Sequence, residues 1–148
     1  MGLKKRIWIA LVVFLLDRAS KLLWPRIPPA GLTLIPGVVG LRPVKNTGMA
    51  FSLFSGHPWI LAAGSLIILA GGILFFRGKE VSPLTGAGLM MMLGGAAGNL
   101  VDRFAMGYVL DMIELQFVRF AIYNLADAFL VIGCGLVILS LFRAEKHG

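Results

Sequence analysis

Four apolar stretches, each about as long as a bilayer is thick, constrain this chain more than any other feature of its sequence. Charged residues or prolines bound them, and they cover residues 7–24, 59–76, 84–101 and 123–142. A transmembrane helix needs ~20 predominantly apolar residues. The sequence therefore predicts an all-α membrane protein, with four transmembrane helices in a single domain over residues 1–148.

The composition excludes the soluble alternatives. Of the 148 residues, 58% are hydrophobic and only 14% are charged, and a chain this short has too little interior to hide so much apolar surface from water. The net charge of +7 fits basic residues at the ends of membrane spans, so we predict no nucleic-acid partner. The single cysteine, Cys134, excludes an intrachain disulfide, and its apolar surroundings predict a packed thiol.

The density of basic residues predicts the orientation. The segments 1–6, 77–83 and 143–148 together carry seven Lys and Arg in 19 residues, whereas the longer segments 25–58 and 102–122 carry only five. Because Lys and Arg are enriched in cytoplasmic segments, both termini are predicted to be cytoplasmic, with the two longer segments outside.

Two outer segments are predicted to form short β-strands. Residues 34–48 are rich in β-branched residues and turn formers, and residues 108–115 form an apolar run that contains Asp111. These strands would make a small extracytoplasmic cap. In the third span, the small residues of Gly94–Gly98 predict a surface that a neighbouring helix approaches closely.

The polar residues of the spans converge on the outer side of the predicted bundle. They are Asp17 and Lys21 in the first span, Asn99, Asp102 and Arg103 at the end of the third, Asn124 and Asp127 at the start of the fourth, and Asn46 and Asp111 in the outer segments. Ionisable residues within spans are costly and usually face a bundle interior or a wet cavity. Their convergence therefore predicts a functional site.

Asp111 and Asp127 are the strongest candidates for chemistry. Both stand in apolar surroundings, and two carboxylates brought together there do not both ionise easily, so one holds a proton and the other does not. Such a pair supplies an acid and a base that activate water for attack on a peptide carbonyl, without a metal.

Other catalytic schemes fit the sequence less well. The two histidines, His57 and His147, fall on opposite sides of the membrane, which excludes a histidine-rich zinc site. No nucleophile motif surrounds any serine. Asp111 also lacks the preceding glycine that marks presenilin-like proteases.

The remaining polar residues also have purely structural interpretations. These are an i,i+4 ion pair for Asp17 with Lys21, a turn for Asn46-Thr47-Gly48, a helix cap or snorkelling for Asn99 with Arg103, and a solvated or helix-end carboxylate for Asp102.

Five sequence blocks, in order along the whole chain, resemble the lipoprotein signal peptidases (signal peptidase II) of bacteria. They are Asp17-Arg-Ala-Ser-Lys21, Asn46-Thr-Gly-Met-Ala-Phe-Ser52, Gly94-Gly-Ala-Ala-Gly-Asn-Leu-Val-Asp-Arg103, Gly107-Tyr-Val-Leu-Asp111 and Tyr123-Asn-Leu-Ala-Asp127. Each block alone is weak evidence. Together, in a chain of this length with four predicted spans, the five blocks are specific for this family.

The resemblance implies a function and a set of site residues. It implies an aspartic endopeptidase that cleaves prolipoproteins immediately before the diacylglyceryl-modified cysteine, at the outer face of the bacterial cytoplasmic membrane. Asp111 and Asp127 match the catalytic pair of the family. The supporting residues that it implies are Asn46, Gly48, Asn99, Arg103, Asn124, and the pair Asp17 and Lys21.

The resemblance also implies the binding partners. These are diacylglyceryl prolipoproteins, membrane lipid and globomycin-type inhibitors, bound by a monomer that uses no metal and no cofactor. Met49, Phe51 and Phe54 are candidates to contact lipid or the signal peptide. The alternative function is a four-span carrier or a cation- or proton-binding membrane protein that uses the same aspartates. A carrier needs polar groups leading to both faces, whereas the inner half of this sequence has few.

Overall fold

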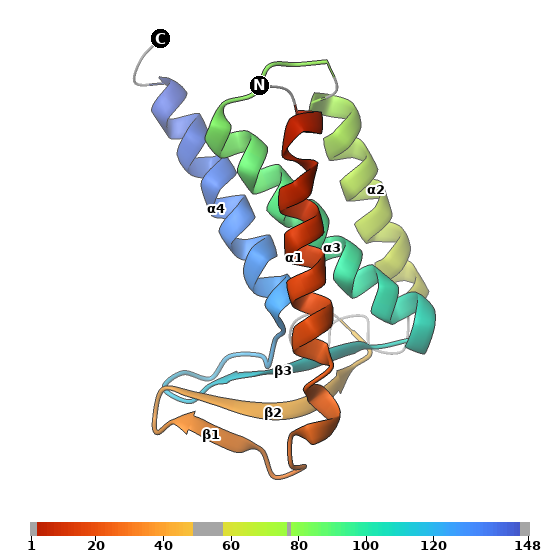
Figure 1. Cartoon of the computed structure of the whole chain (residues 1–148), viewed down its shortest axis with the longest axis vertical. Helices are drawn as coiled ribbons and strands as arrows, with labels where there is room; N and C mark the ends of the chain where they lie inside the picture. The colour runs from red at the N-terminus through yellow and green to blue at the C-terminus, as the bar shows by residue number, and fades with distance from the viewer. Residues whose placement is uncertain (1–2, 49–57, 77, 146–148) are drawn as a thin grey trace.

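Four helices lie side by side along the molecule, and a small sheet covers one end of them (Figure 1). The structure is a computed structural model that describes residues 3–48, 58–76 and 78–145. The helices are α1 (Ile7–Lys21), α2 (Pro58–Phe76), α3 (Pro83–Met106) and α4 (Leu125–Glu145), and the strands are β1 (Leu32–Ile35), β2 (Val39–Asn46) and β3 (Val109–Leu115). Two short 3₁₀ turns, η1 (Leu3–Arg6) and η2 (Trp24–Arg26), flank α1.

The outer surface of the bundle is apolar. Among the described residues, α3 and the Leu125–Arg143 part of α4 are long and apolar enough to cross a membrane. Ile67 and Ile68 on α2 and Val131 on α4 are each 72% exposed. Apolar side chains in such numbers on a surface are typical of helices that meet lipid.

α1 is shorter than predicted. The sequence predicts a span over residues 7–24, whereas α1 ends at Lys21 and the chain enters the Trp24–Arg26 turn. Pro25 explains the difference, because proline lacks a backbone N–H and disfavours the α conformation in the residue before it.

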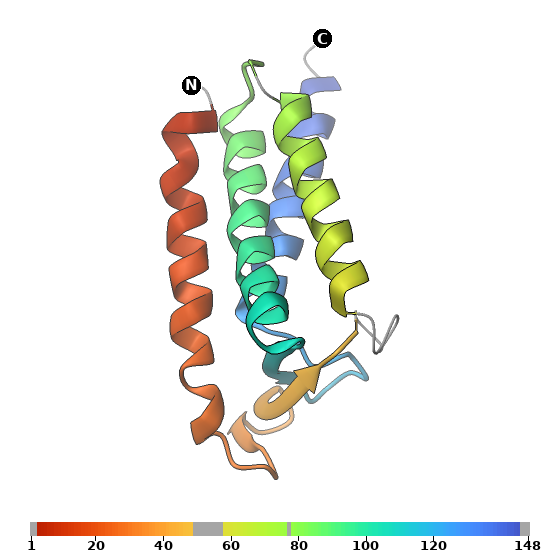
Figure 2. The same cartoon turned by 90° about the vertical axis from the view of Figure 1, so that its right-hand side faces the viewer.

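α3 is longer than predicted and lies at the centre of the bundle. It runs to Met106 rather than Val101, and Gly107 ends it in a left-handed conformation, with φ of 78° and its N–H donating to the carbonyl of Arg103 at 3.0 Å. α1 and α2 lie on either side of α3 (Figure 2).

Glycines let α1 and α4 approach α3 closely, as the sequence predicts. A side-chain carbon on Gly95 would overlap the carbonyl of Ala126 in α4, and one on Gly98 would overlap the carboxylate of Asp17 in α1. The small face of α3 thus brings the acidic ends of two other helices against it.

The three strands form an antiparallel sheet in the order β1-β2-β3. Asp111 on β3 lies opposite Val44 on β2. The chain that enters α4 continues this pairing, because Tyr123 bridges Ile113: the amide of Tyr123 donates to the carbonyl of Ile113 at 3.1 Å, and the amide of Ile113 donates back at 2.7 Å. This bridge places the start of α4 beside β3, so Asp127 lies near Asp111.

Cys134 is exposed on α4, so the prediction of a packed thiol is wrong: that side of α4 faces away from its neighbours. The predictions for Met49, Phe51, Phe54, His57 and His147 lie outside the described residues.

Candidate active site

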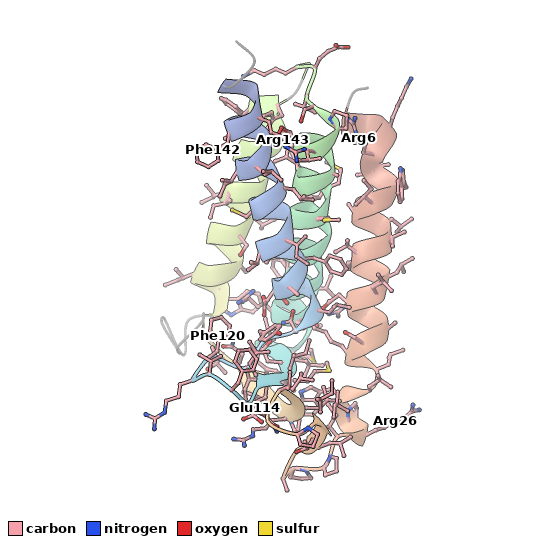
Figure 3. All side chains as sticks on the ribbon, turned by 90° about the vertical axis from the view of Figure 1, so that its left-hand side faces the viewer. Arg6, Arg26, Glu114, Phe120, Phe142 and Arg143 are labelled. Atoms are coloured by element: carbon pink, nitrogen blue, oxygen red, sulfur yellow. The ribbon has the colours of Figure 1, made fainter. Side chains whose placement is uncertain are left out.

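Acidic residues from four elements gather where the bundle meets the sheet. They are Asp17 from α1, Asp102 from α3, Asp111 from β3 and Asp127 from the first turn of α4. Asp17, Asp102 and Asp111 are at most 1% exposed, and Asp127 is half-buried. Asp111 is part of the sheet, and the start of α4 with Asp127 lies beside β3, so this concentration of carboxylates belongs to the sheet end. Arg6 and Arg143 lie at the opposite end of the molecule from Glu114 on β3 (Figure 3).

A capping box fixes Asp127 at the start of α4. The amide of Asp127 donates to Oδ1 of Asn124 at 3.0 Å, and the amide of Asn124 donates to Oδ2 of Asp127 at 3.2 Å. This reciprocal arrangement satisfies two backbone N–H groups that have no partner within the helix. It also explains why α4 begins at Leu125, two residues after the predicted start of the span.

Three asparagine amides hold the carboxylates of Asp111 and Asp127. Asn46 and Asn124 each donate through Nδ2 to one oxygen of Asp111, both at 2.7 Å. Asn99 donates through Nδ2 to Oδ1 of Asp127, also at 2.7 Å. Each carboxylate is therefore oriented by neutral donors, which fix its position without neutralising its charge.

Asp111 binds its proton more tightly than an isolated aspartic acid side chain does in water. Burial, together with the nearby negative charge of Asp127, raises the pKa of Asp111 from 3.8 to about 6, against the opposing hydrogen bonds of Asn46 and Asn124. A carboxyl group with this pKa exchanges its proton near physiological pH, as an acid–base catalyst must.

Beside the pair lies a buried cluster of four charges, in which Arg18 and Lys21 neutralise Asp17 and Asp102. The N···O distances to Asp102 are 2.7 Å from Arg18 and 2.6 Å from Lys21, and those to Asp17 are 2.9 Å and 3.1 Å. The ion pair predicted for Asp17 and Lys21 is thus confirmed. The prediction of a solvated Asp102 is wrong, because its side chain is fully buried between two cations.

The same cluster reaches the backbone next to both candidate aspartates. Oδ1 of Asp17 accepts from the amide of Ala126, and Oδ2 of Asp102 accepts from the amide of Leu110, both at 3.2 Å. These residues directly precede Asp127 and Asp111. Asp17 and Asp102 therefore position the backbone that carries each candidate aspartate.

Asn99 joins the charge cluster to the aspartate pair. Its Oδ1 accepts from Nζ of Lys21 at 3.2 Å and from Nδ2 of Asn124 at 3.0 Å, while its own Nδ2 donates to Asp127. It is therefore part of the network and does not cap α3.

Gly48 and Arg103 lie at the edge of the site. The amide of Gly48 donates to Oδ1 of Asn46 at 2.9 Å, which forms the predicted turn, and Nη2 of Arg103 donates to the carbonyl of Gly48 at 3.4 Å. The structure thus gathers all the residues that the resemblance implies, while their roles in catalysis remain predictions.

The sequence interpretation missed the contacts of three residues, although it placed Asp102 among the converging polar residues. Arg18 and Asp102 complete the charge cluster, and Nε1 of Trp24 donates to the carbonyl of Asp111 at 3.0 Å. Helical spacing carried a signal for Asp102, because it shares one face of α3 with Gly95, Gly98 and Asn99. No comparable signal exists for Trp24, which as a tryptophan at the end of a span fits an interfacial anchor equally well.

A cleft of about 720 Å³ opens from Asp111 and Asn46 across the sheet. Residues of β2, β3 and the segment 118–122 line it. It gives an extended chain access to Asp111 from outside the helix bundle.

Comparisons with known proteins agree with this geometry. Residues 9–143 match the family described as Signal peptidase (SPase) II. A lipoprotein signal peptidase of Trichormus variabilis is 39% identical over 153 residues, covering 99% of this chain and 94% of its own. Another, of Latilactobacillus sakei, is 37% identical over 115 residues, covering 77% and 76% of the two chains.

Solved structures show the same fold. One, described as a bacterial membrane enzyme, has a TM-score of 0.88 and 26% identity, and the match covers 97% of this chain and 91% of the other. A second has a TM-score of 0.82 and 27% identity, covering 93% and 92%.

The fold and the family match define a mainly helical membrane enzyme of the aspartic protease type. The chain belongs to the lipoprotein signal peptidase (signal peptidase II) family over nearly its whole length. The resemblance stated from the sequence is thereby confirmed.

Proposed function

We propose that Asp111 and Asp127 are the catalytic pair and that the enzyme cleaves prolipoproteins immediately before the diacylglyceryl-modified cysteine. The observation that carries this proposal is the joint arrangement of the two carboxylates. Both are held by asparagine amides where the bundle meets the sheet, and a cleft reaches Asp111.

The chemistry requires one protonated and one ionised carboxyl group. The ionised aspartate takes a proton from water as the water oxygen attacks the scissile carbonyl, and the protonated aspartate donates to the carbonyl oxygen. Proton transfer to the amine then lets the peptide bond break, giving a carboxylic acid and an amine. The raised pKa of Asp111 supports its use as an acid–base group. The scheme as written uses no metal and no cofactor.

The supporting residues keep this geometry. Asn46, Asn99 and Asn124 orient the carboxylates, while Asp17 and Lys21 hold α1 against the other helices. Arg103, through Gly48, fixes the turn at one end of the cleft.

We also propose that all four helices span the bacterial cytoplasmic membrane, with both termini cytoplasmic and the site on the outer side. The basic residues near the chain ends and the acidic residues near the sheet support this orientation. The enzyme would act as a monomer, with membrane lipid and globomycin-type inhibitors among its other ligands.

The decisive experiment compares one prolipoprotein with and without its diacylglyceryl group, incubated with the purified enzyme and followed by gel shift. We expect the lipidated form to be cleaved at least about a hundredfold faster, because two acyl chains fix the depth of the scissile bond, whereas a signal helix alone slides at little cost. EDTA should leave the rate unchanged.

Three outcomes would contradict the proposal. Equal rates on the two substrates would exclude lipoprotein processing, and loss of activity in EDTA with recovery in zinc would exclude the aspartic mechanism. Aspartate-dependent ion transport without cleavage would favour the carrier.

A further inference from the structure

The cleft extends well beyond the candidate catalytic residues. It begins at Asn46 and Asp111 and reaches Leu115, Gln116 and Arg119. From Asp111 to Leu115 along β3 is four residues, or about 13 Å at the rise of a strand. The cleft is thus long enough for four or five residues of an extended peptide.

The cleft as a whole carries more positive than negative charge. Its lining contains Arg42, Lys45 and Arg119 against a single acidic residue, Glu114, apart from Asp111 itself. Glu114 already pairs with Arg42 at 3.2 Å. Within the described residues, no carboxylate lies at ion-pair distance from Lys45 or Arg119, so two exposed cations face the cleft without an acidic partner.

The ammonium group of Lys45 also has a defined position. It lies 5.0 Å from the centre of the Tyr108 ring, which attracts the cation and orients its side chain. The side chain of Lys45, which lines the cleft, therefore has a preferred position.

The position of the cleft outside the helix bundle determines which part of a substrate can reach it. The signal peptide is apolar and stays in the bilayer, whereas the sheet that carries the cleft lies beyond the ends of the helices (Figure 1). If Asp111 acts at the scissile bond, as the proposed function requires, the chain that crosses the sheet is the segment after the cysteine.

We propose that this cleft binds the four or five residues that follow the lipidated cysteine, and that Lys45 and Arg119 favour acidic side chains there. This proposal rests on the proposed function and adds a substrate preference to it. The attraction acts in partly exposed surroundings, so it tunes the rate among substrates and does not decide whether cleavage occurs.

The test uses the full-length enzyme in neutral detergent and three lipidated substrates. They differ only in the second to fifth residues, counting the cysteine as the first, which are acidic, neutral or basic. We expect kcat/KM to be about fivefold higher for the acidic than for the neutral substrate, as one or two exposed ion pairs allow, and lower for the basic one. The preference should shrink as salt is added.

Substitutions of cleft residues test whether the cleft causes the preference for acidic substrates. The double variant Lys45→Gln and Arg119→Gln should bring the acidic-to-neutral ratio close to one, and Arg119→Glu should favour the basic substrate. Glu114→Gln should raise the ratio, because it releases Arg42. Arg26→Gln is the matched control: this exposed cation at the same end does not line the cleft, so both rate and ratio should be unchanged.

The proposal is overturned if the double variant keeps the wild-type ratio, or if Arg26→Gln loses it equally. It is also overturned if the double variant slows all three substrates alike and only when phosphatidylglycerol is present, because the cations would then bind lipid headgroups. Melting temperatures near that of the wild type show that each variant is folded. If the wild-type enzyme cleaves none of the lipidated substrates, the proposed function fails instead.

Discussion

Asp111 and Asp127 are held by hydrogen bonds that discriminate between a carboxylate and its nearest substitutes. Each oxygen of Asp111 accepts from an amide nitrogen. An asparagine there would turn an NH₂ group toward one of these donors and has no acidic proton to exchange. The shape of the site would survive the change, but its acid–base function would not.

We therefore expect Asp111→Asn and Asp127→Asn each to lower cleavage of a lipidated prolipoprotein by at least about a thousandfold, the upper part of the range for losing a general acid or base. Both proteins should remain inserted in the membrane. Gel-shift assays on purified protein measure the activity, and substantial turnover by either variant would exclude the pair. Glu80→Gln, in the loop before α3, is the control and should keep its activity.

The raised pKa of Asp111 also predicts how stability depends on pH. Its pKa is 3.8 as an isolated group and about 6 in the folded protein, so the folded state binds more protons between these values. Stability falls as pH rises through this window, by an amount on the order of 3 kcal/mol in total.

The melting temperature of the wild type should accordingly drop more between pH 4 and pH 7 than that of Asp111→Asn, which lacks this titration. Thermal unfolding of both proteins in one detergent measures the difference. Parallel curves would mean that the pKa of Asp111 is ordinary.

The sequence was informative about residues whose surroundings are local. Asp111 and Asp127 stand out because their neighbours along the chain are apolar. The ion pair of Arg18 with Asp102 left no such signal, since the two residues lie about 80 positions apart in the sequence. A buried ion pair formed between distant segments leaves no periodic pattern in either segment.

At the scale of elements, Lys21 links α1 to α3 in addition to forming an i,i+4 ion pair within α1. It lies at ion-pair distance from Asp17 and Asp102 and donates to Asn99. Removing it leaves two buried carboxylates with Arg18 as their only counter-ion among the described residues.

Lys21→Ala should destabilise the protein by about 3–5 kcal/mol, the usual consequence of breaking a buried ion pair. Thermal unfolding tests this, and Arg26→Ala is the exposed control. A Lys21→Ala protein with a normal melting temperature but no activity would instead place Lys21 in the chemistry.

The close contact of α1 with α3 depends on Gly98. A methyl group there would overlap the carboxylate of Asp17, and the helices would have to separate. We expect Gly98→Ala to destabilise the protein by about 1–3 kcal/mol. Gly135→Ala on α4 is the matched control, because nothing lies within 4 Å of its added carbon and alanine favours a helix. Equal melting temperatures for the two variants would contradict this account.

Most of the elements could be predicted from the sequence, because long apolar runs and alternating β-branched residues are local signals. The ends of the helices were predicted less well. Pro25, Gly107 and the capping box of Asn124 with Asp127 are local signals that the predicted spans did not use. The burial of Asp102 within α3 depends instead on cations of α1, which no local pattern shows.

At the scale of the whole molecule, polarity separates the two ends. The sheet lies at one end together with the cleft and the buried carboxylates. Arg6 and Arg143 lie at the other end (Figure 3). The middle contains apolar residues and glycines, such as Val13, Met90 and Gly94. This arrangement fits a one-sided enzyme better than a carrier with access from both faces.

Single cysteines test the proposed topology. In a Cys134→Ser background, which the exposure of Cys134 makes tolerable, Arg26→Cys should react with a membrane-impermeant maleimide in spheroplasts. Lys79→Cys should react only after lysis, since it lies in the loop at the opposite end. Reaction of both before lysis, or the reverse pattern, would overturn the orientation.

The four-charge cluster also has a consequence for biosynthesis. Asp17, Arg18 and Lys21 enter the membrane together, carrying one positive charge in excess, and Asp102 is synthesised about 80 residues later. The backbone amide of Ala126, which donates a hydrogen bond to Asp17, is synthesised later than Asp102. Until then the nascent protein carries an uncompensated cation at the rim of its first helix. A ribosome that stalls before Asp102 leaves a fragment in which that charge stays unbalanced.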